Sequence, residues 1–259
     1  MVVLSASFSV RSLRRSSALA LGSFLFPTRC IACDRRPVER FFRGGVCDAC
    51  WEALPGLETR RCSRCDEAIA AEDADLCGRC LMDPPGFARL RAAAPYRGAA
   101  RGVLLAFKFR GADFLAAAIA RRMHERLRAP SGAPRVVAAP ARRAASGGYR
   151  PALLLGAAVA ARLGLPFDPR GLEKARPTER QSRMRWARRD RNVRGAFRAR
   201  PVSGAVLLVD DVSTSGATAR ECARVLTGAG AESVEVWCFA RASRIDLALE
   251  PAETLEERP

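Results

Sequence analysis

Four Cys-x-x-Cys pairs near the start of the chain constrain its fold more than any other feature. The pairs are Cys30/Cys33, Cys47/Cys50, Cys62/Cys65 and Cys77/Cys80, and 13, 11 and 11 residues separate successive pairs. Two cysteines at this spacing can bind the same tetrahedral Zn²⁺, and two such pairs complete a Cys₄ site. A disulfide framework rarely repeats one spacing so regularly, and a thioredoxin-like redox motif needs a single pair. The array therefore predicts two zinc sites whose positions are all filled by thiolate, so both zincs are expected to be structural.

The spacing alone leaves the pairing of these cysteines open. Sequential pairing, in which the first two pairs share one zinc and the last two share another, is the simplest arrangement. Interleaved pairing fits the same spacing. In either case residues 30–81 form a double zinc ribbon too small for a core of its own, to whose folding each zinc would contribute on the order of 10 kcal/mol.

After the cysteines, the pattern of apolar residues predicts an α/β domain over residues 88–245. Short apolar runs, typical of buried strands, alternate with longer stretches that carry apolar residues at helical spacing. Strands are expected over residues 135–140, 205–210 and 233–240, and helices over residues 98–109, 114–127, 152–163 and 217–226. This alternation predicts a mostly parallel sheet flanked by helices, with ligands at the carboxyl ends of the strands.

Both ends of the chain are expected to lie outside these two domains. Residues 1–29 are predicted to form an apolar or amphipathic helix; basic residues precede an apolar run as in a signal peptide, but no small-residue cleavage site follows. The acidic residues 246–259 are expected to be disordered. No window holds eighteen consecutive uncharged apolar residues, so the sequence predicts no membrane span and a cytoplasmic protein.

The positive charge of the chain is concentrated in one segment. The formal net charge is +17, and residues 170–200 hold twelve basic and three acidic residues. Residues 30–80, by contrast, hold eight basic and ten acidic residues. A uniform compositional bias would not concentrate the excess in this way, so the basic segment is expected to contact a polyanion.

One further stretch, "VLLVDDVSTSGATA" (residues 206–219), carries two adjacent acids at the end of an apolar strand. Small hydroxyl-bearing residues and Gly216 follow and lead into a helix, whose N-terminal N–H groups and dipole favour a phosphate. Two carboxylates beside a phosphate would repel it unless they bind another group, and a pair of ribose hydroxyls, with Mg²⁺ nearby, suits them. A phosphorylated ribose therefore fits both halves of the stretch, whereas a capped helix after an acidic strand end leaves the paired acids unexplained.

The same stretch resembles the phosphoribosyl pyrophosphate signature of type I phosphoribosyltransferases. Together with the cysteine ribbon, it makes nearly the whole chain similar to the ComF family of competence proteins and their GntX-like relatives. Further matching elements are "LFPTRCIAC" (25–33), "CDACWEALP" (47–55), "FKFRG" (107–111) and "RPTERQSRMRWARRDRNVRGAF" (176–197). The resemblance implies a phosphoribosyltransferase-like sheet with an N-terminal double zinc ribbon.

This resemblance also assigns residues to a site. Asp210 and Asp211 would bind the ribose 2′- and 3′-hydroxyls of phosphoribosyl pyrophosphate, in the presence of Mg²⁺. The 5′-phosphate would lie on the turn formed by Thr214, Ser215, Gly216, Ala217 and Thr218. A flexible loop that closes over the site would contain Arg176, Thr178, Gln181, Arg189 and Asn192. Lys108 would either lie near this site or be solvated on its helix.

The chain departs from the family pattern at residues 138–152, "AAPARRAASGGYRPA". The segment is shorter than the usual pyrophosphate loop and lacks its histidine, although Arg142 and Arg143 are candidate cations for a pyrophosphate. No single residue is identified as catalytic.

Two functions therefore remain open at this point. The first is single-stranded DNA handling in DNA uptake, with phosphoribosyl pyrophosphate, single-stranded DNA and other DNA-uptake proteins as partners. Four arginines of the basic segment that the family loop does not use, Arg183, Arg185, Arg188 and Arg191, are its candidate DNA contacts. The alternative is an active phosphoribosyltransferase of nucleotide or base salvage without a DNA role.

Overall fold

The computed structural model describes most of the cysteine-rich segment and of the α/β domain. The described residues are 29–35, 38, 45–54, 56, 60–71, 73–132, 134–140, 150–176 and 191–242. The expected N-terminal helix and the acidic end of the chain lie outside these residues. Among the helices that the structure describes, none is both long enough and apolar enough to cross a membrane.

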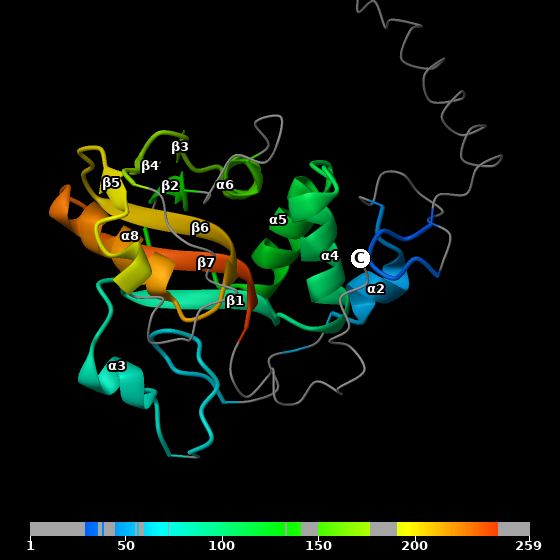
Figure 1. Ribbon diagram of the computed structural model, residues 1–259, viewed down its shortest axis with the longest axis horizontal. Coiled ribbons are helices and arrows are strands. Elements are labelled where there is room, and N and C mark those ends of the chain that lie inside the picture. Colours follow the sequence, from blue (N-terminus) through cyan, green and yellow to red (C-terminus); the bar gives the residue numbers. More distant parts are fainter. Residues whose placement is uncertain are drawn as a thin grey trace, which may run out of the picture.

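A five-stranded sheet forms the centre of the molecule (Figure 1). Its strands, in spatial order, are β1 (Arg89–Pro95), β7 (Ser233–Arg241), β6 (Ala205–Ser213), β2 (Arg135–Ala138) and β3 (Phe167–Asp168). All four pairings are parallel, so the carboxyl ends of the strands meet at one edge. The predicted α/β fold class is confirmed.

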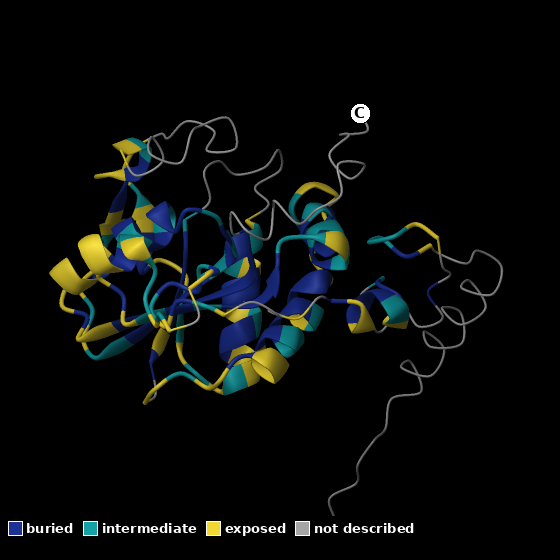
Figure 2. Ribbon diagram, turned by 90° about the horizontal axis from the view of Figure 1, so that it is seen from below, coloured by how far each residue is buried: buried dark blue, intermediate teal, exposed yellow. Residues whose placement is uncertain are grey.

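Helices cover both faces of this sheet because alternate residues of its central strands point to opposite sides. On one face, Leu207 and Val209 of β6 pack in a core with helices α4 (Gly98–Phe109), α5 (Leu115–Arg126) and α6 (Pro151–Leu163). On the other face, Val206 and Leu208 pack with α8 (Ala217–Gly228). Figure 2 colours the central strands between these layers as buried. Burial on both faces explains why β6 begins with a continuous apolar run, from Ala205 to Val209.

Three parts of this architecture were not predicted from the sequence. Strand β1 occupies one edge of the sheet, and its alternating arginines hide the apolar pattern; Arg89 forms an ion pair with Glu235 of β7 at 2.9 Å. Strand β3 has only two residues. A separate antiparallel pair, β4 (Leu172–Lys174) and β5 (Phe197–Ala199), brings together the two ends of the basic segment.

The two halves of the cysteine-rich segment pack on different layers of the α/β domain. Cys30, Cys50 and Trp51 share the core of α4 and α5, and a Cβ on Gly102 of α4 would lie 2.7 Å from the carbonyl oxygen of Ala32. Cysteines of the second half instead share the core of α8 and β1. Accordingly, α2 (Asp48–Glu52) lies beside α4 in Figure 1, whereas α3 (Gly78–Met82) lies on the side of β1 and α8.

Candidate functional site

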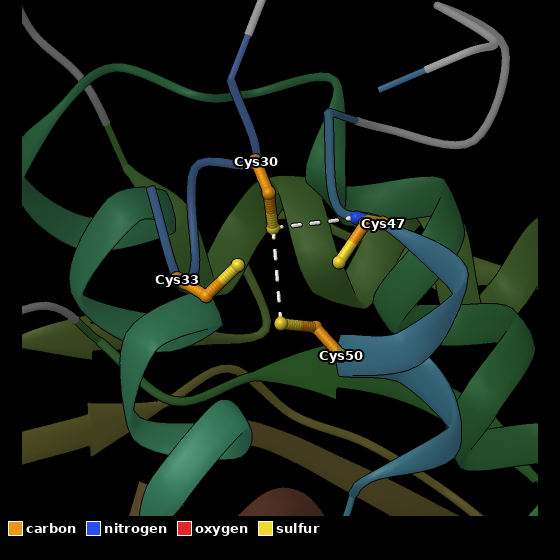
Figure 3. Close-up of side chains that lie close together, drawn as sticks. All are labelled: Cys30, Cys33, Cys47 and Cys50. Atoms are coloured by element: carbon orange, nitrogen blue, oxygen red, sulfur yellow. Dashed lines mark hydrogen bonds between the residues drawn. The ribbon is translucent and has the colours of Figure 1, made fainter. Parts of the chain in front are cut away.

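The first four cysteines converge on one point (Figure 3). The sulfur atoms of Cys30, Cys33, Cys47 and Cys50 all lie within 4.8 Å of one another, and those of Cys30 and Cys50 are 3.8 Å apart. A tetrahedral zinc with Zn–S bonds of about 2.3 Å places its sulfurs about 3.8 Å apart. The amide of Cys47 donates a hydrogen bond to Cys30 Sγ at 3.3 Å, which helps to hold this sulfur in place.

The second four cysteines repeat this arrangement. The sulfurs of Cys62, Cys65, Cys77 and Cys80 lie within 4.8 Å of one another, and Cys77 donates its amide to Cys62 Sγ at 3.3 Å. Burial of Cys62 opposes its ionisation, but hydrogen bonds from the backbone of Cys77, Cys65 and Arg64 outweigh burial and lower the pKa of this thiol to about 7. Both clusters therefore fit structural zinc, and the pairing is sequential.

The two acids of the "VDD" stretch lie at the carboxyl end of β6. Asp211 is buried, with 8% of its surface exposed, and its Oδ1 lies 2.8 Å from Nζ of Lys108 at the end of α4. The pKa of Lys108 is raised: burial would lower it, but the charge of Asp211 and the hydrogen bond to this carboxylate outweigh burial. Lys108 is therefore a charged component of the site, an alternative that the sequence left open.

Asp210 lies beside this pair in a different electrostatic state. Burial and the negative charge of Asp211 raise the pKa of the Asp210 carboxyl to about 7, while Lys108 acts in the opposite direction. One Oδ of Asp210 accepts the amide hydrogen of Asp211 at 2.9 Å. The site thus holds two acids and one lysine, and Asp210 changes its protonation near neutral pH.

The turn after β6 leads directly into α8. Gly216 has a φ of +74°, a left-handed conformation that L side chains rarely adopt, and it is the N-cap residue of the helix. The hydroxyl of Ser215 accepts a hydrogen bond from the amide of Ala217 at 3.4 Å. Thr214 and Thr218 are half-buried on the same turn. We call residues 213–218 the phosphate turn, after the group that the sequence predicts to bind there.

Part of the expected flexible loop is visible at its two ends. Arg176 donates from Nη2 to the carbonyl oxygen of Asn192 at 3.1 Å, and the same nitrogen contacts that of Arg194. This contact brings together the two ends of the basic segment. The remaining loop positions, Thr178, Gln181 and Arg189, lie outside the described residues, as do Arg142, Arg143, Arg183, Arg185 and Arg188. Arg191 is described and exposed.

A cleft of about 500 Å³ opens at the carboxyl end of β2, beside β6 in the sheet. Its apolar wall includes Ala138, Pro140 and Leu153. Four cationic residues also line it: Arg150, Arg170, Lys174 and Arg200. Glu173 is the one acidic residue of the lining. The sequence showed the excess of positive charge but not this cleft, because the residues that line it come from four separate segments.

Comparisons with known proteins find a family match for the cysteine-rich segment and relatives that cover most of the chain. Residues 21–81 match the double zinc ribbon domain. The chain is 34% identical over 209 residues to "DNA utilization protein YhgH" of Salmonella typhi, which covers 76% of this chain and 90% of the relative. It is 26% identical over 234 residues to "Competence protein F" of Haemophilus influenzae, covering 84% of this chain and 98% of the relative. A solved structure titled as the allosteric regulatory enzyme of purine biosynthesis aligns with a TM-score of 0.34 and 24% identity, over 49% of this chain and 26% of that chain.

Proposed function

We propose, because the chain belongs to the ComF family, that it binds phosphoribosyl pyrophosphate with Mg²⁺ and handles single-stranded DNA. The observation that carries the first half is the juxtaposition of Asp210, Asp211 and Lys108 with the phosphate turn at one strand end. The relatives' names, which refer to DNA utilization and competence, support the second half. The boundaries at residues 30–81 and 88–245 are part of this proposal.

The acids and the turn have separate tasks in the proposed site. Asp210 and Asp211 accept hydrogen bonds from the two ribose hydroxyls, and charged acceptors make these bonds stronger than neutral ones. The phosphate turn binds the 5′-phosphate through the N-terminal end of α8. Lys108 offsets the charge of Asp211, so that the two acids do not repel the phosphates of the ligand.

Carboxylate oxygens are also the ligands that Mg²⁺ prefers, so Asp210 and Asp211 fit a bound Mg²⁺. The ion would neutralise charge on the pyrophosphate. The contribution of the protein is to hold the ribose in a fixed orientation beside the cleft at the end of β2.

Calorimetric titration of the purified protein with phosphoribosyl pyrophosphate, with and without Mg²⁺, tests this binding. We expect a saturable site that weakens without Mg²⁺. Ribose 5-phosphate, which keeps the ribose hydroxyls and the 5′-phosphate, should bind more weakly at the same site. Absence of saturable binding of either ligand would contradict the proposal.

The cationic residues of the cleft and of the basic segment support the DNA half of the proposal. Arg150, Arg170, Lys174 and Arg200 lie around an apolar wall, and this concentration of positive charge suits the phosphates of a single strand. Titration of a fluorescent oligonucleotide at several salt concentrations tests it, because each phosphate contact releases counterions. A log–log slope near zero would reject DNA binding.

The alternative function, phosphoribosyl transfer to a free base, shares the same sugar site. It predicts release of pyrophosphate when the protein is incubated with phosphoribosyl pyrophosphate, Mg²⁺ and a panel of bases. Release with a base and no DNA affinity would favour salvage. Ligand binding without release would favour a binding role.

A further inference from the structure

We infer that the second cysteine cluster positions the phosphate turn, and that three arginines transmit this effect. The identity of the bound ligand rests on the proposed function, whereas the mechanical contact does not. The three residues are Arg241, Arg79 and Arg220, which are positioning residues because each acts through the backbone or a side chain of the turn and its helix.

Arg241 lies directly behind the turn at the end of β7. Its side chain is almost fully buried, with 2% of its surface exposed. Nη1 donates to Ser213 Oγ at 2.7 Å, and Nη2 donates to Glu67 Oε2 at 2.7 Å. A Cβ on Gly216 would lie 3.8 Å from the same Nη1. One guanidinium thus joins the phosphate turn to Glu67, which follows Cys65 by two residues.

Two further contacts reinforce this buried one. Arg79 of α3 donates from Nη1 to the carbonyl oxygen of Ser215 at 2.6 Å. Arg220 of α8 donates in the opposite direction, to the carbonyl oxygen of Asp83 at 2.7 Å and to its carboxylate at 3.1 Å. Its Nη2 also lies 3.8 Å from Cys80 Sγ. The turn and the start of α8 are therefore held by the second cluster at three points.

The metal ligands of this cluster set the positions of the contacting residues. Helix α3, which contains Cys80 and begins after Cys77, carries Arg79, and the loop after Cys65 carries Glu67. Binding of one zinc to these cysteines would fix α3 and the loop relative to each other. The first cluster, in contrast, packs on α4 and α5 on the opposite face of the sheet. Loss of order in the second cluster should therefore disturb the phosphate turn more than loss of order in the first cluster.

Linkage requires that this effect be reciprocal. A sugar phosphate that needs an ordered turn should bind more weakly when the second cluster is disordered. By the same factor, a bound sugar phosphate should raise the affinity of the second cluster for zinc.

The test compares paired variants of the full chain by amide hydrogen exchange of residues 213–218 and by calorimetry with phosphoribosyl pyrophosphate. Arg79→Gln combined with Glu67→Gln weakens two of these links; the second change keeps the shape of the side chain, and the first shortens it and removes the guanidinium. We expect faster exchange in the phosphate turn and about tenfold weaker binding, since charge-assisted hydrogen bonds are removed. Arg79→Lys, which keeps a donor for the Ser215 carbonyl, should restore most of both signals when Glu67 is present.

Arg60→Gln is the matched control, because it removes an arginine from the same cysteine-rich segment. Arg60 donates hydrogen bonds to the Asp75 carboxylate at 3.0 Å and to the carbonyl oxygen of Ala74, within that segment. This substitution should leave exchange and binding unchanged. A second comparison uses two double variants, each of which is expected to lose one zinc. In one, Cys77 and Cys80 of the second cluster are changed to serine; in the other, Cys47 and Cys50 of the first cluster are changed to serine. Only the former should accelerate exchange at residues 213–218.

The outcomes separate this inference from the proposed function. Unchanged exchange in the Arg79/Glu67 variant, or equal acceleration by both pairs of cysteine substitutions, would overturn the coupling. Because exchange requires no ligand, a wild-type protein that does not bind phosphoribosyl pyrophosphate would reject the proposed function and leave the coupling testable.

Discussion

Asp210 and Asp211 are adjacent in sequence but differ in their electrostatic surroundings. Asp211 has a cationic partner at 2.8 Å, whereas burial and the neighbouring charge raise the pKa of Asp210 to about 7. The sequence identified both acids as candidates because no structural requirement explains a buried strand that ends in two carboxylates. It did not establish that Lys108 contacts Asp211, because 102 residues lie between these two and only the tertiary fold brings them together.

Neutralising both acids should abolish most sugar-phosphate binding. At pH 8, above the raised pKa of Asp210, the double change Asp210→Asn with Asp211→Asn removes two charged acceptors, each contributing about 1.5–3 kcal/mol to hydrogen bonds with a ligand. We expect at least about a tenfold loss of affinity for phosphoribosyl pyrophosphate by calorimetry. Circular dichroism and zinc content serve as controls for the fold. Unchanged affinity would show that the acids do not bind the ribose.

The raised pKa of Asp210 also predicts a pH-dependent cost in stability. The folded protein holds this proton up to about pH 7, whereas an unfolded chain releases it near pH 4. The stabilising effect of the proton is therefore lost as pH rises from about 4 through 7. Asp210→Asn should be more stable than the wild type at pH 8 by at least about 1 kcal/mol, a rise in melting temperature of roughly 2–4 °C.

Thermal denaturation of the two proteins at pH 5.5 and pH 8 measures this difference, which should shrink at the lower pH. Zinc release affects both proteins alike and cancels in the comparison. Asp211→Asn is the contrasting control: it removes the partner of Lys108 and should destabilise the protein at pH 8. If Asp210→Asn is destabilised to the same extent, the acid is ionised and paired in the folded protein.

At the scale of elements, the sequence predicted those whose pattern depends on local chemistry. Strand β6 begins with five apolar residues in a row, β7 is mostly apolar apart from Glu235, and the cysteine pairs are recognised from their spacing alone. Strand β1 was missed because Arg89 and Arg91 interrupt its apolar residues, and its place at the edge of the sheet is what tolerates them. The cationic cleft and Arg241 could not be predicted either, because their significance comes from segments that meet only in the folded chain.

The basic segment should govern DNA binding without supporting the zinc sites. We expect that changing Arg183, Arg185, Arg188 and Arg191 to glutamine lowers the salt slope of single-strand binding by about 0.7 for each phosphate that the variant no longer binds. Affinity for phosphoribosyl pyrophosphate should change much less, because the two acids and the phosphate turn are intact. Salt-dependent fluorescence titration measures the first quantity, and calorimetry measures the second.

The opposite pattern would favour the salvage alternative. If DNA affinity survives the replacement of all four arginines while sugar-phosphate binding collapses, the segment acts as a cover of the sugar site. A control variant removes four positive charges outside this segment by changing four other arginines to glutamine: Arg35, Arg97, Arg128 and Arg162. The expected slope for this control is close to that of the wild type.

At the scale of the molecule, two small metal sites are packed on opposite layers of one α/β domain. Each cluster shares a hydrophobic core with helices of that domain rather than forming a core of its own. The sequence predicted the number of sites and their ligands. It did not predict that the two sites would be separated by the sheet, since spacing carries no information on docking.

We expect two tightly bound zincs per chain. Replacing Cys62 and Cys65 by serine should remove one of them and make the second cluster sensitive to protease, because structural zinc contributes on the order of 10 kcal/mol to a segment of this kind. Elemental analysis and limited proteolysis measure these effects. The equivalent change at Cys30 and Cys33 should also remove one zinc but expose a different segment. One zinc or none in the wild type would contradict the assignment.

The burial of Arg241 behind the phosphate turn has a consequence for how the protein is made. Glu67 and Cys80 leave the ribosome well before the strand that carries Arg241, 161 residues after Cys80. At about 5–20 residues per second, the nascent second cluster waits roughly 8–32 seconds for the surface on which it docks. During that interval its four thiols have no α/β domain to pack against, so early zinc capture by the growing chain would protect them from oxidation. Translation speed and the zinc supply of the cell thus become determinants of how much of this protein reaches its folded state.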